Sequence, residues 1–481
     1  MFAPDINSIS SSINANPHYM VEPFTPPLPL VLCLVAAAGA VIASFIVLIF
    51  FYKNTHAYST YPKFDLMKLS VFGYIERAHI KFIIQLFSVF LFIIVVLSGF
   101  IGSSDPVYNI APTFVWVIWW VGLAYVSAFV GNLWSLINPW KIIFEWCEQV
   151  SGLFVRNSSI SVQLSYPSNL KAWPAVLLFV VFAWIENVYP GAIVPSKISL
   201  IILVYSIITW VGMFLFGKDT WLRNGEVFTL VFGYLSRFAP IHGESIKTAS
   251  GKTGTSSNIK THLYVRPISS GLLDIKSASI SETLLILLLL ATVTFDGFTG
   301  TKRWMDIQIY LEPYSNNITL INTCGLIFTI FIFFVVYFAF AKLMKLASGS
   351  SFSAQHLATT FVHTLIPIAL AYHVAHFLMF LLIQGQTIIP LASDPFGFDW
   401  NIFNTTLYRV NFMIASSNFY WSISIISILV GHIIAVFLSH SIAMRLFESQ
   451  SSAIRSQYPM LLLMVGYTVA SLWIITQPMY A

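Results

Sequence analysis

Charged residues are scarce in this chain. Asp, Glu, Lys and Arg make up 9% of the 481 residues, whereas ordinary soluble domains contain roughly 25%. Hydrophobic residues make up 57%, which leaves too few charged side chains for the surface of a soluble protein. The composition therefore predicts an all-α polytopic protein of the cell membrane, with the lipid bilayer as a partner. The formal net charge of +5 indicates no nucleic-acid partner, because the basic residues lie in loops between apolar runs.

Cysteine is also scarce, and several catalytic motifs are missing. Cys33, Cys147 and Cys324 lie in or beside different apolar runs without a CxxC spacing, which argues against a disulfide framework and a thiolate zinc site. We expect them to be small buried side chains. The sequence contains no GxSxG, GxxxxGKS/T or HExxH pattern, so serine-hydrolase, nucleotide-binding and zincin mechanisms lose their usual support.

Apolar runs long enough to cross a membrane fill most of the chain. A helix needs roughly 20 residues to cross the hydrocarbon core, and ten such runs occur. They begin near Leu28, Phe82, Thr113, Trp173, Ile198, Ser281, Leu320, Thr360, Tyr420 and Pro459. The sequence predicts a helix bundle of ten membrane spans.

The positions of Lys and Arg test this number. With the first tail outside, only four of the 24 Lys and Arg residues fall on the outer side. These four are Lys197, Lys302, Arg303 and Arg409. Because cytoplasmic loops carry the excess of positive charge, we expect both termini to face outward.

Four regions follow from this topology. We expect residues 1–27 to form an uncleaved outer tail and residues 28–245 to hold the first five spans with interfacial helices. Residues 246–280 should be a flexible inner linker, because residues 247–260 are rich in Gly, Ser, Thr and Lys. Residues 281–481 should hold the last five spans.

Two amphipathic segments are expected at the inner interface. Asn138 and Pro139 suit the cap and first position of a helix, and a second segment runs from residue 219 to 238. One face of the first helix should hold Trp140, Ile143, Phe144 and Cys147. Five tryptophans are expected to be interfacial anchors, namely Trp116, Trp119, Trp120, Trp134 and Trp140.

Histidines within apolar runs are the main functional clue. His373 and His376 lie three residues apart in one run, and His432 lies in another. An ionisable side chain at membrane depth usually faces the bundle interior, pairs with a second group or marks a functional path. We expect these three imidazoles at mid-depth, where they could bind zinc or copper. Two alternatives stay open: one haem held by two imidazoles, and hydrogen bonds to neighbouring helices without a cofactor.

Three carboxylates fall near the outer ends of predicted spans. Glu186 lies in FAWIENVYPG, Asp296 in TFDGF and Asp394 in SDPFG. Together with His376 they could line a cavity and act as metal ligands or as a general base for a bound water. The alternative for both aspartates is turn or cap chemistry, because Asp296 precedes a glycine and Asp394 precedes a proline.

Two residues that disturb helices suggest a different function. Pro367 lies in the run of His373, and Gly431 directly precedes His432. Both helices could therefore kink or unwind near the histidines, as in secondary transporters whose broken helices surround a midplane site. A transporter or proton relay is thus an alternative to an enzyme, and a haem or copper electron carrier is another.

Several strings resemble a prokaryotic membrane protein family whose members are described as uncharacterised or as fenitrothion hydrolase-like. The resemblance covers roughly residues 28 to 440. The strings are NIAPTFVWVIWWVG from Asn109, GNLWSLINPW from Gly131, FAWIENVYPG from Phe182, PIALAYHVAHFLMFLLIQGQ from Pro367, SDPFG from Ser393 and GHIIAVFLSH from Gly431.

The resemblance implies hydrolysis of a lipophilic, organophosphate-like ester that enters from the bilayer. A metal hydroxide would supply the attacking water. The ligands would then be His373, His376 and His432, and the residues orienting water would be Asp394, Asp296 or Glu186; these assignments come from the residues themselves and not from the family. A small lipophilic substrate is the expected partner, and a second membrane subunit is left open.

Overall fold

The computed structural model describes residues 30–51, 62–68, 78–154, 160–248, 258–274 and 277–477. The chain is 75% helical, which agrees with the all-α class expected from composition. The expected outer tail, residues 1–27, lies outside the described residues.

Within the described residues, nine helical segments are long and apolar enough to cross a membrane. They coincide with nine of the ten expected runs, and the remaining run forms the shorter apolar helix α9, Trp173–Asn187. The long helices are α2 (Leu30–Phe51), α4 (Ala78–Ile101), α10 (Pro195–Phe216), α13 (Ile280–Thr299), α15 (Ile318–Ser348), α19 (Ser417–Leu446) and α20 (Gln450–Ile475). The two other candidates are composite segments, Ile110–Phe129 and Ala354–Ser393.

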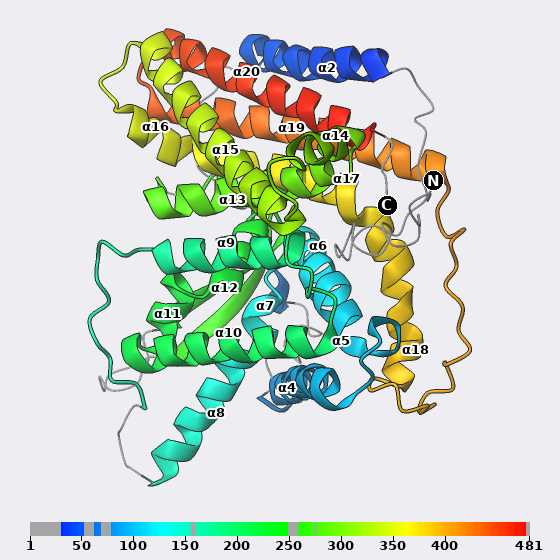
Figure 1. The fold of residues 1–481 in the computed structure, drawn as a ribbon. Helices are drawn as coiled ribbons and strands as arrows, with labels where there is room; N and C mark the ends of the chain where they lie inside the picture. Colours follow the sequence, from blue (N-terminus) through cyan, green and yellow to red (C-terminus); the bar gives the residue numbers. More distant parts are fainter. Residues whose placement is uncertain are drawn as a thin grey trace, which may run out of the picture.

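The helices form two groups that meet at α13 and α9 (Figure 1). In one group α20 packs against α2, α15 and α19, and in the other α10 packs against α4. Helix α13 contacts α15 on one side and α9 on the other. The polar residues described below lie at this junction, where the helices are least exposed.

The composite segment Ala354–Ser393 is broken twice. It consists of α16 (Ala354–Phe361), the 3-10 turn η6 (Val362–Leu365), α17 (Ile366–Gln384), the 3-10 turn η7 (Gly385–Thr387) and α18 (Ile388–Ser393). Pro367 lies in the first turn of α17, where its missing N–H costs nothing. The break expected near Pro367 is therefore confirmed. Helix α19, in contrast, continues through Gly431 without interruption.

The segment Ile110–Phe129 contains a π-helix. Residues Thr113–Gly122, labelled η4, adopt this wider helix between α5 (Ile110–Pro112) and α6 (Leu123–Phe129). At its end the N–H of Leu123 reaches back to the carbonyl of Ile118. π-Helical turns are rare and occur frequently at functional sites. This one carries Trp120, which contacts a buried carboxylate.

Shorter helices follow the third and the fifth expected spans. They are α7 (Trp134–Ile137), α8 (Pro139–Phe154), α11 (Lys218–Asn224) and α12 (Val227–Leu235). Asn138 caps α8 as expected, since its Oδ1 accepts from the N–H of Lys141 at 3.1 Å. On the expected apolar face of α8, Trp140 and Phe144 are buried, Ile143 is half-buried and Cys147 is exposed. The other described elements are η2 (Leu66–Lys68), η3 (Pro106–Tyr108), η5 (Ser270–Leu272) and α14 (Lys302–Leu311).

A small antiparallel sheet occupies part of the expected linker. Strands β2 (Ile241–Thr248) and β3 (Asn258–Val265) pair with each other, and β3 also pairs with β1 (Phe64–Asp65), so the order is β1-β3-β2. The segment expected to be a flexible linker, residues 246–280, therefore contains the end of β2 and the whole of β3, which pair through backbone hydrogen bonds, and α13 begins at its last residue, Ile280. Residues 249–257 lie outside the described residues.

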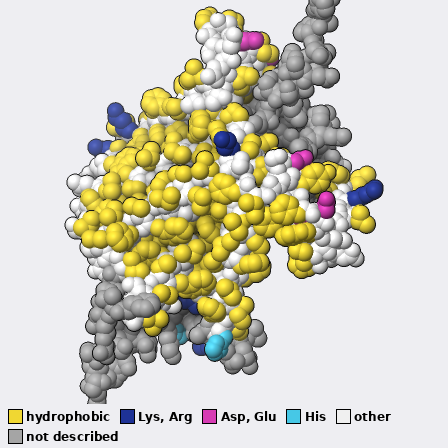
Figure 2. Space-filling model, turned by 60° about the horizontal axis from the view of Figure 1, so that its bottom comes forward, with side chains coloured by type: hydrophobic (Ala, Val, Ile, Leu, Met, Phe, Trp, Pro, Cys, Tyr) yellow, Lys and Arg dark blue, Asp and Glu magenta, His cyan; other side chains and the backbone are white. Residues whose placement is uncertain are grey.

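Hydrophobic side chains cover the face shown in Figure 2, which contains the lower elements of Figure 1. Phe87 of α4 and Ile207 of α10 are each 60% exposed, as expected for helices in contact with lipid. Two cysteines also lie at the surface: Cys147 and Cys324 are exposed, and only Cys33 is buried. The expectation of three buried cysteines is thus wrong for two of them, because hydropathy alone does not distinguish a core-facing side from a lipid-facing side.

Candidate functional site

A buried histidine–aspartate pair links α17 to α13. The Nε2 atom of His376 lies 2.8 Å from Oδ2 of Asp296, and their side chains are only 4% and 2% exposed. Asp296 lies one turn before the end of α13, where Thr299 donates to its backbone carbonyl at 2.7 Å. A carboxylate has no proton to donate when ionised, so the imidazole N–H donates to it. The expected association of His376 with Asp296 is confirmed.

The second ring nitrogen of His376 is available for another proton carrier. Within the part of the chain that the structure describes, the buried Nδ1 atom of His376 has no hydrogen-bond partner. Buried polar atoms of this kind are uncommon and call for an explanation such as a bound water or a catalytic role. With Nε2 in contact with Asp296, Nδ1 is the ring nitrogen that is left for a further hydrogen bond.

Glu186 forms a second buried polar pair. It lies near the end of α9, is 6% exposed, and accepts a hydrogen bond from Nε1 of Trp120 at 2.6 Å. Its neighbour Asn187 donates to the carbonyl of Ala183 at 2.8 Å, while the buried Oδ1 of Asn187 has no partner among the described residues. Trp120 thus donates a hydrogen bond to a buried carboxylate. It is not the interfacial anchor that its position in an aromatic-rich run predicted.

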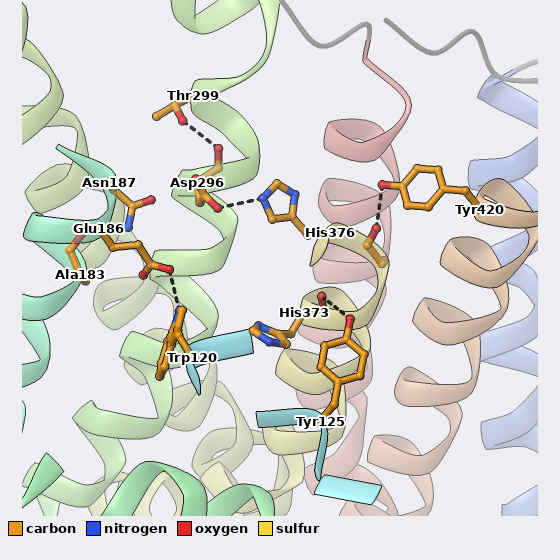
Figure 3. A network of polar contacts seen from close by, with 11 residues as sticks. Trp120, Tyr125, Ala183, Glu186, Asn187, Asp296, Thr299, His373, His376 and Tyr420 are labelled. Carbon is orange, nitrogen blue, oxygen red and sulfur yellow. Dashed lines mark hydrogen bonds and ion pairs between the residues drawn. The ribbon is translucent and has the colours of Figure 1, made fainter. Parts of the chain in front are cut away.

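The two pairs lie beside one small cavity. Its volume is about 40 Å³, and its wall includes Glu186, Asp296, His373, Trp120 and Thr292. About 10–15 Å³ of such volume holds one water, so the cavity has room for two to four waters. Figure 3 shows the rings of His373 and His376 pointing from α17 toward the helices that carry Asp296 and Glu186. The structure thus places Glu186, Asp296 and His373 around one cavity, whose wall does not include His376.

Hydroxyl groups fix the backbone of α17 from the opposite side. Tyr420 donates to the carbonyl of Ala375 at 2.8 Å, and Tyr125 donates to the carbonyls of His373 and Val374 at 3.4 and 3.3 Å. Both tyrosines are labelled in Figure 3. Sequence reasoning missed them because their roles depend on which helices are neighbours. The only available signal was a tyrosine inside an apolar run.

His432 has a different environment from the other two histidines. Its Nδ1 lies 2.7 Å from the carbonyl of Ile428, one turn earlier in the same helix, and the residue is 1% exposed. Since a carbonyl can only accept, Nδ1 carries the proton. In the described residues, no group of three or more His, Cys, Asp or Glu side chains is arranged to hold a metal ion. The zinc or copper site of His373, His376 and His432 thus stays a prediction that this geometry does not support.

Asp394 does not join the other carboxylates. Its Oδ1 accepts from the N–H of Phe398 at 2.9 Å and its Oδ2 from the N–H of Trp400 at 3.2 Å. It is absent from the wall of the 40 Å³ cavity. The turn chemistry expected as the alternative for this aspartate is what the structure contains.

Comparison of the chain with protein-family models, curated proteins and solved structures finds no match. The resemblance to the fenitrothion hydrolase-like family, and the ester hydrolysis that it implies, therefore stay predictions.

Proposed function

We propose that this chain is a proton-coupled membrane transporter in which His376 and Asp296 carry the proton. The observation that supports this most is the 2.8 Å contact between His376 Nε2 and Asp296 Oδ2, with both side chains almost fully buried among membrane-length helices. Chains of Asp, Glu and His inside membrane bundles are typical of proton relays. The contact gives the proton two adjacent acceptors in a medium that otherwise excludes charge.

Neighbouring groups extend this pair into a relay. The 40 Å³ cavity brings Glu186 and His373 to the same space as Asp296, and waters within it would connect groups that are too far apart for direct transfer. Tyr372 also lies beside the pair, because its ring centroid is 6.2 Å from that of His376. Asp296 and Tyr372 thus lie next to His376, and Glu186 and His373 share the cavity with Asp296.

Broken helices favour transport over hydrolysis. The 3-10 turns η6 and η7 divide the helix that carries both histidines, and a short 3-10 stretch inside a long helix often marks a hinge. A hydrolase would need a metal, a side-chain nucleophile or an activated water at the pair, and the first two lack support. Within the described residues no metal-binding group of three is present, and His376 Nδ1 has no hydroxyl or thiol within hydrogen-bond distance.

The proposed topology has ten spans with α9 as the shortest, and both termini outside the cell membrane. The charge distribution supports this, because only four of the 24 Lys and Arg residues then lie outside. The Glu186 end of α9 and the Asp296 end of α13 would both be close to the outer side. A proton would therefore reach the pair from the outer compartment more readily than from the inner one.

The proposal is tested by measuring proton binding directly. Protein labelled with ¹⁵N-histidine, studied by NMR in nanodiscs, should show one histidine that titrates together with a buried carboxylate. That signal should disappear in H376N and change its titration in D296N, and it should persist in H432N. An unaltered His376 signal from about pH 4 to about pH 9 would overturn the relay.

Proton movement gives the functional readout. In liposomes with an internal pH-sensitive dye and an imposed membrane potential, wild-type protein and H432N should acidify the lumen, whereas H376N and D296N should not. His432 is the matched control because it is equally buried but bonds only its own helix. Equal rates in all four proteins would contradict the assignment.

A further inference from the structure

A second group of titratable side chains lies at the other end of the helices that carry the proposed proton pair. It consists of His363 on η6, Tyr234 on α12 and Glu282 on α13, with Arg237 just after α12. Glu282 lies in the first turn of α13, about 21 Å along the helix axis from Asp296. In the proposed topology this end of α13 faces the inner compartment.

Tyr234 is the centre of this inner cluster. Its hydroxyl donates to Oε1 of Glu282 at 3.1 Å, and its ring centroid is 6.2 Å from that of His363. The guanidinium of Arg237 lies over the same ring, 5.8 Å from its centroid, which is a cation–π geometry. Tyr234 thus contacts the other three members of the cluster.

Exposure increases from His363 toward the inner surface. His363 is 2% exposed and Tyr234 is 4% exposed, whereas Glu282 and Arg237 are half-buried. The carboxylate of Glu282 therefore reaches water more readily than the imidazole does. The order imidazole, phenol, carboxylate is a series of proton carriers that leads from the interior to the surface.

The inner cluster lies close to the inner wall of the 40 Å³ cavity. Leu235 of α12 and Ala369 of α17 line that cavity, and Ala369 is about 9 Å along its segment from His363. The fully buried Leu365 and Ile366 lie between them in the chain. One apolar layer thus separates the cavity from His363, and the 3-10 turn η6 is the place at which the helix can move.

Charged groups of opposite sign act on His363, namely Arg237 and Glu282. η6 also packs against α16, α17 and α19. Of the histidines on these helices, His356 of α16 is exposed and His440 of α19 bonds a glutamine of α20 at 2.9 Å. The charge of Arg237 opposes a second positive charge on the imidazole, and the carboxylate attracts one. A proton on His363 is therefore drawn toward Glu282.

We infer that His363 is the proton-binding residue at the inner end of the relay, from which the proton passes to Glu282 and then to water of the inner compartment. The inference rests on the proposed proton-coupled transport. The Tyr234 hydroxyl accepts a proton from the imidazolium as it gives its own to the carboxylate. His363 and Glu282 both become neutral, so their summed charge is zero before and after the step and no net charge is created in a buried site.

Proton uptake by proteoliposomes tests the role of His363. In the liposome assay with the internal dye, H363N should lower the rate on the order of a hundredfold, the lower end of what a positioned proton carrier contributes. H356N is the matched control and should keep the wild-type rate, because His356 lies in the same segment but is exposed. A wild-type rate in H363N, with H376N inactive, would overturn this inference alone. Wild-type rates in both would overturn the proposed function as well.

Variants of the two neighbours separate a proton path from a structural role. E282Q keeps the capping box at the start of α13, because Gln can replace Glu in that motif, and it removes the proton acceptor. Y234F keeps the ring beside His363 and removes the hydroxyl. Both should slow proton uptake.

The outer pair reports whether these variants are folded. In H363N, E282Q and Y234F the ¹⁵N signal of His376 should keep its wild-type titration, because the His376–Asp296 contact lies at the other end of the helices. Slow uptake together with an altered His376 signal in all three variants would overturn the inference, since the cluster would then act on the structure of the outer pair. Wild-type uptake in both E282Q and Y234F would also overturn it.

Discussion

The imidazole of His376 and the carboxylate of Asp296 are in hydrogen-bond contact at 2.8 Å in the interior of the helix bundle. They come from helices that begin 86 residues apart in the sequence, Ile280 for α13 and Ile366 for α17. The contact therefore fixes the rotation of α17 relative to α13. The stability of the bundle and the proposed proton relay both involve this one contact, which makes its removal informative.

Removing the carboxylate should destabilise the protein strongly. D296A leaves a buried imidazole without its partner, and breaking a buried pair costs about 3–5 kcal/mol. D394A is the control, because Asp394 accepts only from backbone N–H groups of its own loop and its loss should cost about 1 kcal/mol. Thermal unfolding in detergent measures both. A smaller loss for D296A than for D394A would show that the pair is not important for stability.

The hydrogen bond to Glu186 should be worth more than a neutral one of similar length. Trp120 donates to Glu186 at 2.6 Å, and Trp184 donates to the hydroxyl of Thr323 at 2.9 Å. Bonds to a charged group contribute about 1.5–3 kcal/mol, against about 0.5–1.5 kcal/mol for neutral ones. W120F should therefore lower the free energy of unfolding more than W184F in denaturant titrations. Equal losses would mean that Glu186 is uncharged in the folded protein.

A side chain at Gly431 should separate α17 from α19. An added Cβ would lie 2.4 Å from Cβ of Ala371 and 2.6 Å from the carbonyl oxygen of Pro367. Neither neighbour can rotate away, so G431A should cost about 1–3 kcal/mol. G466A, in α20, meets nothing within 4 Å and should be neutral or stabilising by up to about 1 kcal/mol. Opposite signs in the two unfolding measurements are the expected result, and equal effects would contradict it.

An ion pair outside the membrane spans should weaken only at high pH. Partial burial disfavours the charged Lys218, but its 2.9 Å bond to Glu145 outweighs this and holds the pKa of Lys218 above the usual value. An unfolded lysine titrates near pKa 10.4, so the contribution is fully present below that pH and is lost as pH rises through the higher folded value. The wild type should therefore lose stability above about pH 10.4 relative to K218M. A constant difference between them at all pH values would contradict this.

Sidedness can be measured with single cysteines. After replacement of Cys33, Cys147 and Cys324, D306C in α14 and E448C after α19 place reactive thiols at exposed positions. The ten-span topology predicts that an impermeant maleimide added to whole cells labels D306C and not E448C. Labelling of E448C after the cells are opened is the control for reactivity. Labelling of both in whole cells would contradict the proposed topology.

The sequence predicted the spans well because helices in lipid must satisfy their own backbone hydrogen bonds, so length and apolarity suffice to find them. It also predicted that Asp296 and Glu186 lie near the helix of His376. The sequence could not distinguish Asp296 and Glu186, which line the cavity, from Asp394, which caps a turn. Whether a carboxylate does one or the other depends on how the helices pack. The environment of His432 could not be predicted for a related reason: the bond to Ile428 within its own helix has no signature in composition.

Other features were missed because they require distant partners. Strand β3 lies in a segment with the composition of a linker, and its pairing with β1 depends on residues about 200 positions earlier, such as Tyr264 opposite Asp65. The π-helix η4 has no recognisable pattern among the apolar residues of its run. In each case the local sequence permits several conformations, and contacts with other elements select one of them.

The position of α2 has a consequence for biosynthesis. This helix packs against α20 and α19, which are synthesised long after it. Until these helices are made, α2 must stay in lipid or bound to the insertion machinery. A chain that stops before Ser417, the start of α19, leaves α2 without these two packing partners. Membrane quality-control proteases would therefore recognise a truncated chain by the unpacked helix α2.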